Sequence, residues 1–316
     1  MTQPVDDTRS LPGTQLSWTS LRERLLDGIV LAVLLGALIL FALLPGPALR
    51  WMRAPFIGAF VQPHLVFNDL SGAGATDWSA EQLGLEFGDQ LVAVDDAAVA
   101  SAAELLAELH SRQIGEQIVL GIEQRNGDQM TISLTLRALP LIDRMVYAYV
   151  PYLVGFAYLL LSLWVFGTRR GEPAARAFTV LGAALAVVLA GWYDTNSSHQ
   201  FVIFWTAALG LVGAGLFHLG LTFPRPHGIS LRAAYLRMLG YVVAVLLVAN
   251  ALAGLSQAGV PWLYTNAWRL LAIFVGAAFG FLLVMVVLRR MNTPSPVEAQ
   301  QTRVVLWAAG FAFFPG

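Results

Sequence analysis

Residues 25–44 read LLDGIVLAVLLGALILFALL, and this apolar run decides the class of protein. A helix needs about 20 mostly apolar residues to cross the hydrocarbon core of a bilayer. The run is too long for the core of a secretory signal peptide, and no small-residue cleavage site follows it. We therefore interpret it as a signal anchor that stays in the protein as its first transmembrane helix.

Further apolar runs of similar length follow along the chain, at 146–166, 177–193, 201–223, 236–255 and 268–288. Another run starts near Val304 and reaches Gly316, which is too short to cross a membrane. The composition agrees, since 57% of the residues are hydrophobic and 12% are charged, whereas soluble domains carry about 25% charged residues. We predict an α-helical membrane bundle with six full transmembrane helices and a truncated seventh at 304–316, belonging to a longer protein.

The arginines predict the orientation of these helices. With the N-terminus in the cytoplasm, twelve arginines fall in cytoplasmic segments, and four fall in the short external flanks. The four external residues are Arg50, Arg53, Arg144 and Arg269. Since cytoplasmic loops carry the excess of positive charge, we expect residues 1–24 to form a cytoplasmic tail and the block 50–142 to lie outside. The expected location is the cytoplasmic (inner) membrane of a bacterium, in which the chain is multi-pass.

The block after the first helix has the pattern of a small α+β domain. Strand-like runs occupy 65–67, 89–94, 117–124 and 130–136, and a helical run occupies 102–110. Ser101 and Glu104 have the spacing of a capping box at the start of that helix. Asn126-Gly127, between the last two strand runs, is a strong hairpin signal.

The segment Gly84-Leu85-Glu86-Phe87-Gly88-Asp89 precedes the strand-like run QLVAVDD at 90–96 and then Val99. Together these residues resemble the GL-x-x-GD segment of bacterial PDZ domains. Gly84 and Gly88 permit a tight turn, and Asp89 can cap it. The resemblance implies a PDZ-like fold for the whole inserted block, with the helix that follows as the groove helix.

Members of that family bind the C-terminus of a peptide as an added strand beside the groove helix. The resemblance places such a groove at Phe60, Leu105 and Leu109, so an extracytoplasmic peptide or protein is an expected partner. The nearest equivalent of the carboxylate-binding loop is 56–60, which abuts the membrane, and Asp96-Ala97 stands where the family often has Asn-Gly. A folded sensor or spacer domain without a peptide ligand is the alternative.

Several chemistries have no motif in this sequence. There is no cysteine, and none of the five histidines lies in an HExxH motif, which a site-2 metalloprotease needs. No GxSG motif of a rhomboid protease and no nucleotide-binding motif occurs. We therefore assign no catalytic, cofactor-binding or metal-binding residue and expect no cofactor. The net charge of −1 gives no reason to expect nucleic acid as a partner.

Two polar residues fall inside expected membrane helices, His218 and Asn250. Ionisable and polar groups at such depth are candidates for a functional site, and hydrogen bonding between helices is the alternative. Small residues are spaced for helix packing at Gly210, Gly213 and Gly215 and, as a GxxxG motif, at Gly276 and Gly280. That motif indicates either packing within one bundle, which we favour, or a homodimer.

Aromatic residues gather at the expected external ends of the helices. They are Trp192, Tyr193, Trp262, Tyr264 and Trp268. An interfacial aromatic belt beside the lipid bilayer is the favoured interpretation. The alternative is an outward pocket formed with Asp194, Asn196 and His199.

A second resemblance concerns the expected cytoplasmic segments. FHLGLTFPRP at 217–226 resembles the H-x-x-x-x-FP-x-P helix end of multi-helix bacterial sensor histidine kinases, and SPVEAQQTR at 295–303 resembles the next such segment. Competence-type quorum-sensing kinases combine such helices with an external PDZ-like domain. The resemblance implies the N-terminal sensor region of such a kinase, with its output domain beyond residue 316 and dimerisation expected.

Two other functions stay open. One is a membrane adaptor whose PDZ-like domain captures protein C-termini for a partner protease. The other is a transporter or channel subunit, although no acidic pair lies inside a helix to couple transport to ions.

Overall fold

The computed structural model describes residues 18–73, 78, 83–223, 231–257, 259–292 and 300. It is mostly helical, and six helical stretches are long and apolar enough to cross a membrane. The predicted set of six transmembrane helices is confirmed, while the expected seventh at 304–316 lies outside the described residues. The long helices are α1 (Trp18–Leu43), α6 (Val150–Arg169), α7 (Pro173–Ala190), α9 (Val202–Thr222), α10 (Leu231–Leu255) and α11 (Leu263–Asn292).

Four short helical elements extend or connect these spans. They are α2 (Pro45–Arg53), α5 (Leu141–Arg144), the π-helix η2 (Met145–Tyr149) and α8 (Trp192–Thr195). The apolar run 177–193 is in fact divided, because α7 ends at Ala190 and α8 starts at Trp192. The predicted run 268–288 starts later than α11, which begins at Leu263. The early turns of this helix carry polar residues such as Thr265, whose hydroxyl is hydrogen-bonded to Gln62.

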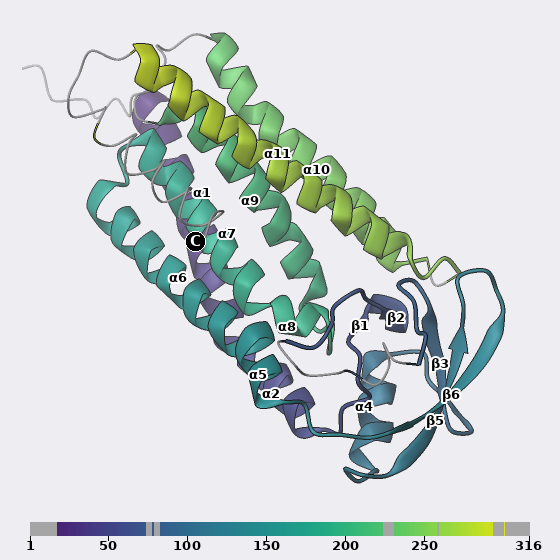
Figure 1. Cartoon of the computed structure of the whole chain (residues 1–316). Coiled ribbons are helices and arrows are strands. Elements are labelled where there is room, and N and C mark those ends of the chain that lie inside the picture. Colours follow the sequence, from purple (N-terminus) through teal and green to yellow (C-terminus); the bar gives the residue numbers. More distant parts are fainter. Residues whose placement is uncertain are drawn as a thin grey trace, which may run out of the picture.

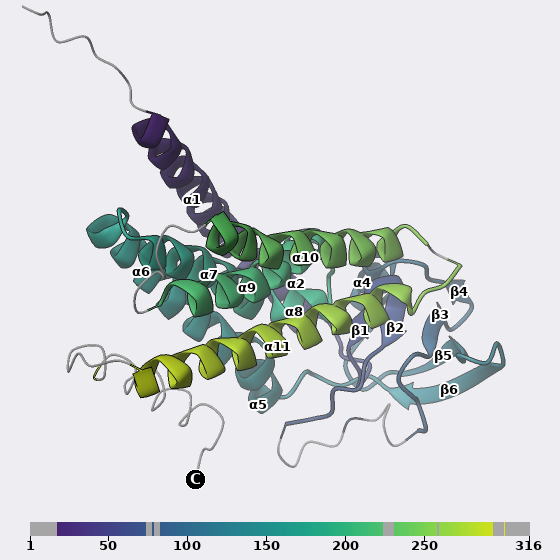
Figure 2. The ribbon, with the colours of Figure 1, turned by 90° about the horizontal axis from the view of Figure 1, so that it is seen from above.

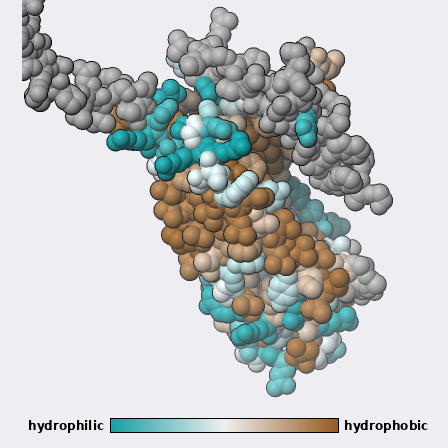
Figure 3. Space-filling model, turned by 90° about the vertical axis from the view of Figure 1, so that its left-hand side faces the viewer, coloured by the Kyte–Doolittle hydropathy of each residue, from teal (hydrophilic) through white to brown (hydrophobic). Residues whose placement is uncertain are grey.

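The bundle is built around two central helices. α7 contacts α1, α6 and α9, whereas α9 contacts α7, α10 and α11. Helices α1 and α6 therefore lie on one side and α10 and α11 on the other (Figures 1 and 2). On the face shown in Figure 3, a hydrophobic band covers the middle of the molecule, with hydrophilic residues towards both ends. These features define a multi-pass membrane protein.

Glycines of α9 allow its neighbours to approach closely. A side chain at Gly210 would collide with Val248 of α10, and one at Gly213 would collide with Phe274 of α11. Gly276 and Gly280 differ, because a Cβ atom added at either position meets no described atom within 4 Å. The favoured interpretation that this GxxxG motif packs within the bundle is therefore wrong for the described part of the chain.

An antiparallel sheet and one helix form a compact unit between α2 and α5, and we call residues 54–139 the sheet unit (Figure 1). The strands follow the order β1-β2-β3-β5-β6, and β4 pairs with β3. The elements are β1 (Val61–Gln62), η1 (Pro63–Leu65), β2 (Val66–Phe67), β3 (Gln90–Val94), β4 (Ala97–Ala98), α4 (Ala102–His110), β5 (Gln117–Glu123) and β6 (Gln129–Thr135).

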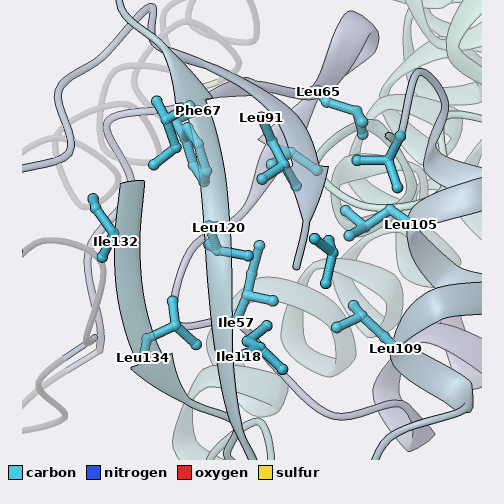
Figure 4. Packing of buried hydrophobic residues seen from close by; sticks show 14 of the residues in the cluster. Ile57, Leu65, Phe67, Leu91, Leu105, Leu109, Ile118, Leu120, Ile132 and Leu134 are labelled. Carbon is cyan, nitrogen blue, oxygen red and sulfur yellow. The ribbon is translucent and has the colours of Figure 1, made fainter. Parts of the chain in front are cut away.

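Helix α4 covers one face of the sheet. Leu105 and Leu109 point from α4 into a core with Leu91, Ile118 and Leu120 from the strands (Figure 4). The capped start is confirmed, since the Ser101 side chain accepts a hydrogen bond from Glu104 N at 3.3 Å. The predicted hairpin is confirmed as well, because β5 pairs with β6 through the turn at Asn126-Gly127, where Gly127 has φ 91°.

Candidate functional site: the junction between the sheet unit and the helix bundle

The turn at 84–89 lies on the sheet unit and touches the bundle. Gly84 and Gly88 have φ of 82° and 98°, a region that favours glycine. The carboxylate of Asp89 is buried and accepts a hydrogen bond from Glu86 N at 3.0 Å. Leu85 packs against the core of the unit. Phe87, between the two glycines, lies under the guanidinium of Arg269 of α11 at 3.8 Å from the ring centroid.

The residues expected to form a peptide groove line one cavity. Phe60 lies before β1, while Leu105 and Leu109 come from α4, and all three line the same space. The cavity has a volume of about 20 Å³, which holds roughly one water molecule. Since even one peptide side chain is larger, a peptide enters only if the walls move.

The bundle forms the opposite wall of that cavity. Trp51 of α2, Tyr193 of α8, and Asn196 and Ser197 after α8 form part of the lining. The cavity therefore lies between the sheet unit and the helix ends, and the edge strand β1 also faces these ends, where its Val61 carbonyl contacts His199. We call this contact region the junction.

Phe60 is the centre of an aromatic cluster in the junction. Its ring centroid lies 5.0 Å from that of Trp78, 5.4 Å from Tyr147 and 5.6 Å from Tyr193, in edge-to-face arrangements. Such arrangements are favourable for aromatic pairs. Because Tyr147 belongs to η2 and Tyr193 to α8, one side chain of the sheet unit contacts two separate helical segments.

Buried hydrogen bonds join the sheet unit to α11. The Gln62 side-chain oxygen accepts from Thr265 Oγ1 at 2.8 Å and from Trp268 Nε1 at 3.2 Å. Gln62 and Thr265 are almost completely buried. Arg269 of the same helix forms an ion pair with Asp69 at 3.0 Å. Because buried polar groups lose water, the bonds of Gln62 hold the two parts in a defined position, whereas the Arg269–Asp69 pair is exposed to solvent and contributes less.

The connection between α8 and α9 supplies a second set of bonds. Asn196 accepts a hydrogen bond from Asn68 Nδ2 at 2.9 Å. His199 Nε2 lies 2.8 Å from the Val61 carbonyl oxygen of β1, so its N–H donates there. Although part of the residue stays accessible, the pKa of His199 is lowered to about 4, mainly by burial and to a smaller extent by the nearby His64, while the bond to Val61 opposes the fall.

Asp194 holds that connection in shape. Its carboxylate accepts hydrogen bonds from the Ser198 hydroxyl and from Phe201 N. Burial raises the pKa of Asp194, and the bond from Ser198 opposes this rise. Arg50 of α2 donates to Gln200 at 3.4 Å from the other side.

The start of the α6 span forms the third attachment. Asp143 of α5 is fully buried and accepts from Trp78 Nε1 at 2.9 Å and from Ala73 N at 2.6 Å. The hydroxyl of Tyr147 donates to the Ser71 carbonyl. Tyr147 lies within η2, and single-turn π-helices are frequent at functional sites.

His218 and Asn250 are not brought together. His218 Nδ1 lies 3.0 Å from the Tyr241 hydroxyl, which links α9 to α10. Asn250 is exposed and lies nine residues beyond Tyr241 on α10, or about 14 Å along the helix. No common intramembrane site of these two residues is formed.

The aromatic-belt interpretation is wrong for two residues. Tyr193 is 4% exposed and Tyr264 is 0% exposed, because the sheet unit and α9 cover them. Sequence reasoning missed Gln62, Asn68 and Asp143 of the junction. The one available signal was Asp143, an acidic residue directly before an apolar run.

Comparison with protein-family models gives no match for this chain, and comparison with curated proteins gives none either. Among the described residues, no group of three or more histidine, aspartate or glutamate side chains is arranged to hold a metal ion. The junction thus connects the sheet unit to separate helical segments through buried aromatic contacts and hydrogen bonds.

Proposed function

We propose that the chain is the membrane-embedded input module of a bacterial signal-transduction protein. In this proposal the sheet unit is a PDZ-like domain on the extracytoplasmic side of the inner membrane. The observation that carries the proposal is the junction, where the buried Gln62 and the half-buried Asn68 bond directly to helix ends. A shift of the sheet unit therefore has to move helices or break these contacts.

Three transmembrane segments receive such a shift. The junction contacts α6 through Asp143 and Tyr147, α9 through the connection after α8, and α11 through Thr265 and Arg269. These helices run through the bundle to the end away from the sheet unit (Figure 1). We propose that this far end faces the cytoplasm and controls an output domain.

For the output we propose a sensor histidine kinase acting as a homodimer. The support is the resemblance of segments 217–226 and 295–303 to polytopic sensor kinases. The segment 295–303 lies largely outside the described residues. The first test is therefore ATP-dependent autophosphorylation of the full-length gene product in membranes. Absence of labelling would reject the kinase and leave the choice of output open.

A reversible cross-link across the junction tests the relay, by which we mean transmission of a shift of the sheet unit through the helices to the output domain. The chain contains no cysteine, so Asn68→Cys with Asn196→Cys gives one defined thiol pair, which a short bis-methanethiosulfonate reagent joins. We expect linking to change autophosphorylation at least twofold and reduction to reverse the change. The matched control is Val119→Cys with Ser133→Cys, which are paired across β5 and β6 and cross-link only within the sheet unit.

A control pair that changes the output equally would reject transmission through the junction. An unchanged output in the linked junction would do the same.

The apolar cavity favours one second function, a membrane adaptor that captures protein C-termini. Phe60, Leu105 and Leu109 line it as the resemblance implies. The test is pull-down of decapeptides with a free apolar C-terminal residue, with amidated peptides as the control. Capture that needs the free carboxylate and disappears in Leu105→Glu would favour the adaptor, whereas equal recovery of both peptide sets would reject it.

A further inference from the structure

Two histidines occupy strained positions in the junction. His199, in the connection between α8 and α9, has φ 58°, and His64, in η1, has φ 63°. Residues with a side chain rarely adopt this conformation. The His199 ring lies against the Val61 carbonyl oxygen, whereas His64 Nε2 is buried without a hydrogen-bond partner in the described part of the chain.

Within the described part of the chain, the carboxylates of the elements that pack against His199 are bonded to other groups. On the sheet unit, Asp69 is paired with Arg269 of α11. On the α8 connection, the Asp194 carboxylate bonds to the Ser198 hydroxyl and to Phe201 N, and Arg50 of α2 bonds to Gln200. The group whose charge acts on His199 is His64, which is itself basic. A proton on His199 would therefore be buried beside another imidazole rather than beside a carboxylate.

We propose that His199, with His64, makes the junction sensitive to acid, so that the sheet unit is held on the bundle near neutral pH and released when protons bind. This inference deepens the proposed function, on which it rests, by naming protons as a signal that the junction detects. His199 lies before the span Val202–Thr222, on the side to which we assign the extracytoplasmic solution.

The direction of the pH effect follows from the burial of His199. An exposed imidazole has a pKa of about 6.5, whereas the pKa of His199 in the closed junction is about 4. Because the open junction binds the proton more tightly, closure is favoured above pH 6.5 and weakens as the pH falls towards 4. Because a single proton binds to His199, the ratio of open to closed molecules changes by at most about tenfold per pH unit. Asp194, whose pKa burial raises, works in the opposite direction at the acid end of this range.

The experiment measures the distance between the two parts as a function of pH. Spin labels at Thr131→Cys on β6 and Ser256→Cys after α10, both exposed, report it by double electron–electron resonance in the full chain in lipid nanodiscs. Between pH 7.5 and 5.0 we expect the population with a longer or broader distance to increase at least tenfold. An unchanged distance distribution down to pH 4.5 would overturn the proposal.

Variants assign the effect to the histidine. His199→Gln keeps an N–H donor for the Val61 carbonyl but binds no proton, and we expect it to stay closed over the whole range. His110→Gln, on the exposed part of α4, is the matched control and is expected to open like the parent chain. The same pH dependence in His199→Gln would contradict the proposal.

The outcome is separable from that of the relay proposal, because the distance measurement needs no output activity. Opening by acid without a change in output would reject the relay alone. A cross-link that changes output in a chain without acid-dependent opening would reject the acid response alone.

Discussion

The centre of the bundle and the junction are both buried, but different chemistry holds them together. Around α9, glycines let neighbouring helices approach until side chains such as Phe274 lie against the backbone. In the junction, one aromatic cluster and several buried hydrogen bonds join parts that are separate in sequence. Close packing has one good arrangement, whereas the hydrogen bonds of the junction can be exchanged for bonds to water when its surface opens. We therefore expect the junction to open more readily than the centre of the bundle.

The largest expected effect comes from removing the centre of the aromatic cluster. Phe60→Ala deletes a ring that contacts Trp78, Tyr147 and Tyr193, at a cost of about 3–5 kcal/mol for a buried phenylalanine. We expect hydrogen exchange of segment 191–201 to accelerate about 100-fold or more, while that of α9 stays unchanged. Ile114→Ala, at a residue that is 61% exposed, is the control. Equal acceleration in both segments would show that the junction and the bundle open as one unit.

The matching change in the bundle fills a glycine contact. Gly213→Val would collide with Phe274, and overpacking of this kind costs about 1–3 kcal/mol. Gly276→Val on α11 is the control, since a Cβ atom at that position meets no described atom within 4 Å. We expect unfolding in mixed detergent micelles to be easier for Gly213→Val only. A similar loss in both variants would mean that Gly276 is packed against another chain or against a segment outside the described residues.

A smaller effect is expected for one buried acceptor. Gln62→Ala leaves the Thr265 hydroxyl and the Trp268 N–H without their shared partner, which costs about 1–3 kcal/mol. Hydrogen exchange at the start of α11 should accelerate, and Gln117→Ala on the exposed side of β5 should leave it unchanged. Unchanged exchange in Gln62→Ala would show that water replaces this acceptor and that the junction is wetter than its burial indicates.

The same contrast explains what the sequence could predict. Apolar runs, the capped helix at Ser101 and the hairpin at Asn126-Gly127 are local patterns, and each predicted its element. Strands β1 and β4 have two residues each, which is too short for a period to be visible. The junction joins residues such as Gln62 and Thr265, 203 positions apart, and no local pattern of a single sequence records such a contact. Contact with Phe60 of the sheet unit also buries Tyr193, although the sequence pattern predicts that this residue lies at the lipid surface.

The smallest effects are expected at the two polar residues inside the membrane spans, and they test how uniform the bundle is. His218→Leu removes the bond to Tyr241 between α9 and α10, and such bonds within membrane proteins contribute about 0.6 kcal/mol on average. Asn250→Leu replaces an exposed side chain of α10 and should leave the unfolding free energy within about 0.5 kcal/mol of the parent. Both are measured by the unfolding assay used for the glycine variants. A loss above about 2 kcal/mol at His218 would place a second polar contact region, comparable to the junction, inside the bundle. A loss at Asn250 would instead mean that the exposed face of α10 is covered by another chain or by a segment outside the described residues, because no described residue buries Asn250.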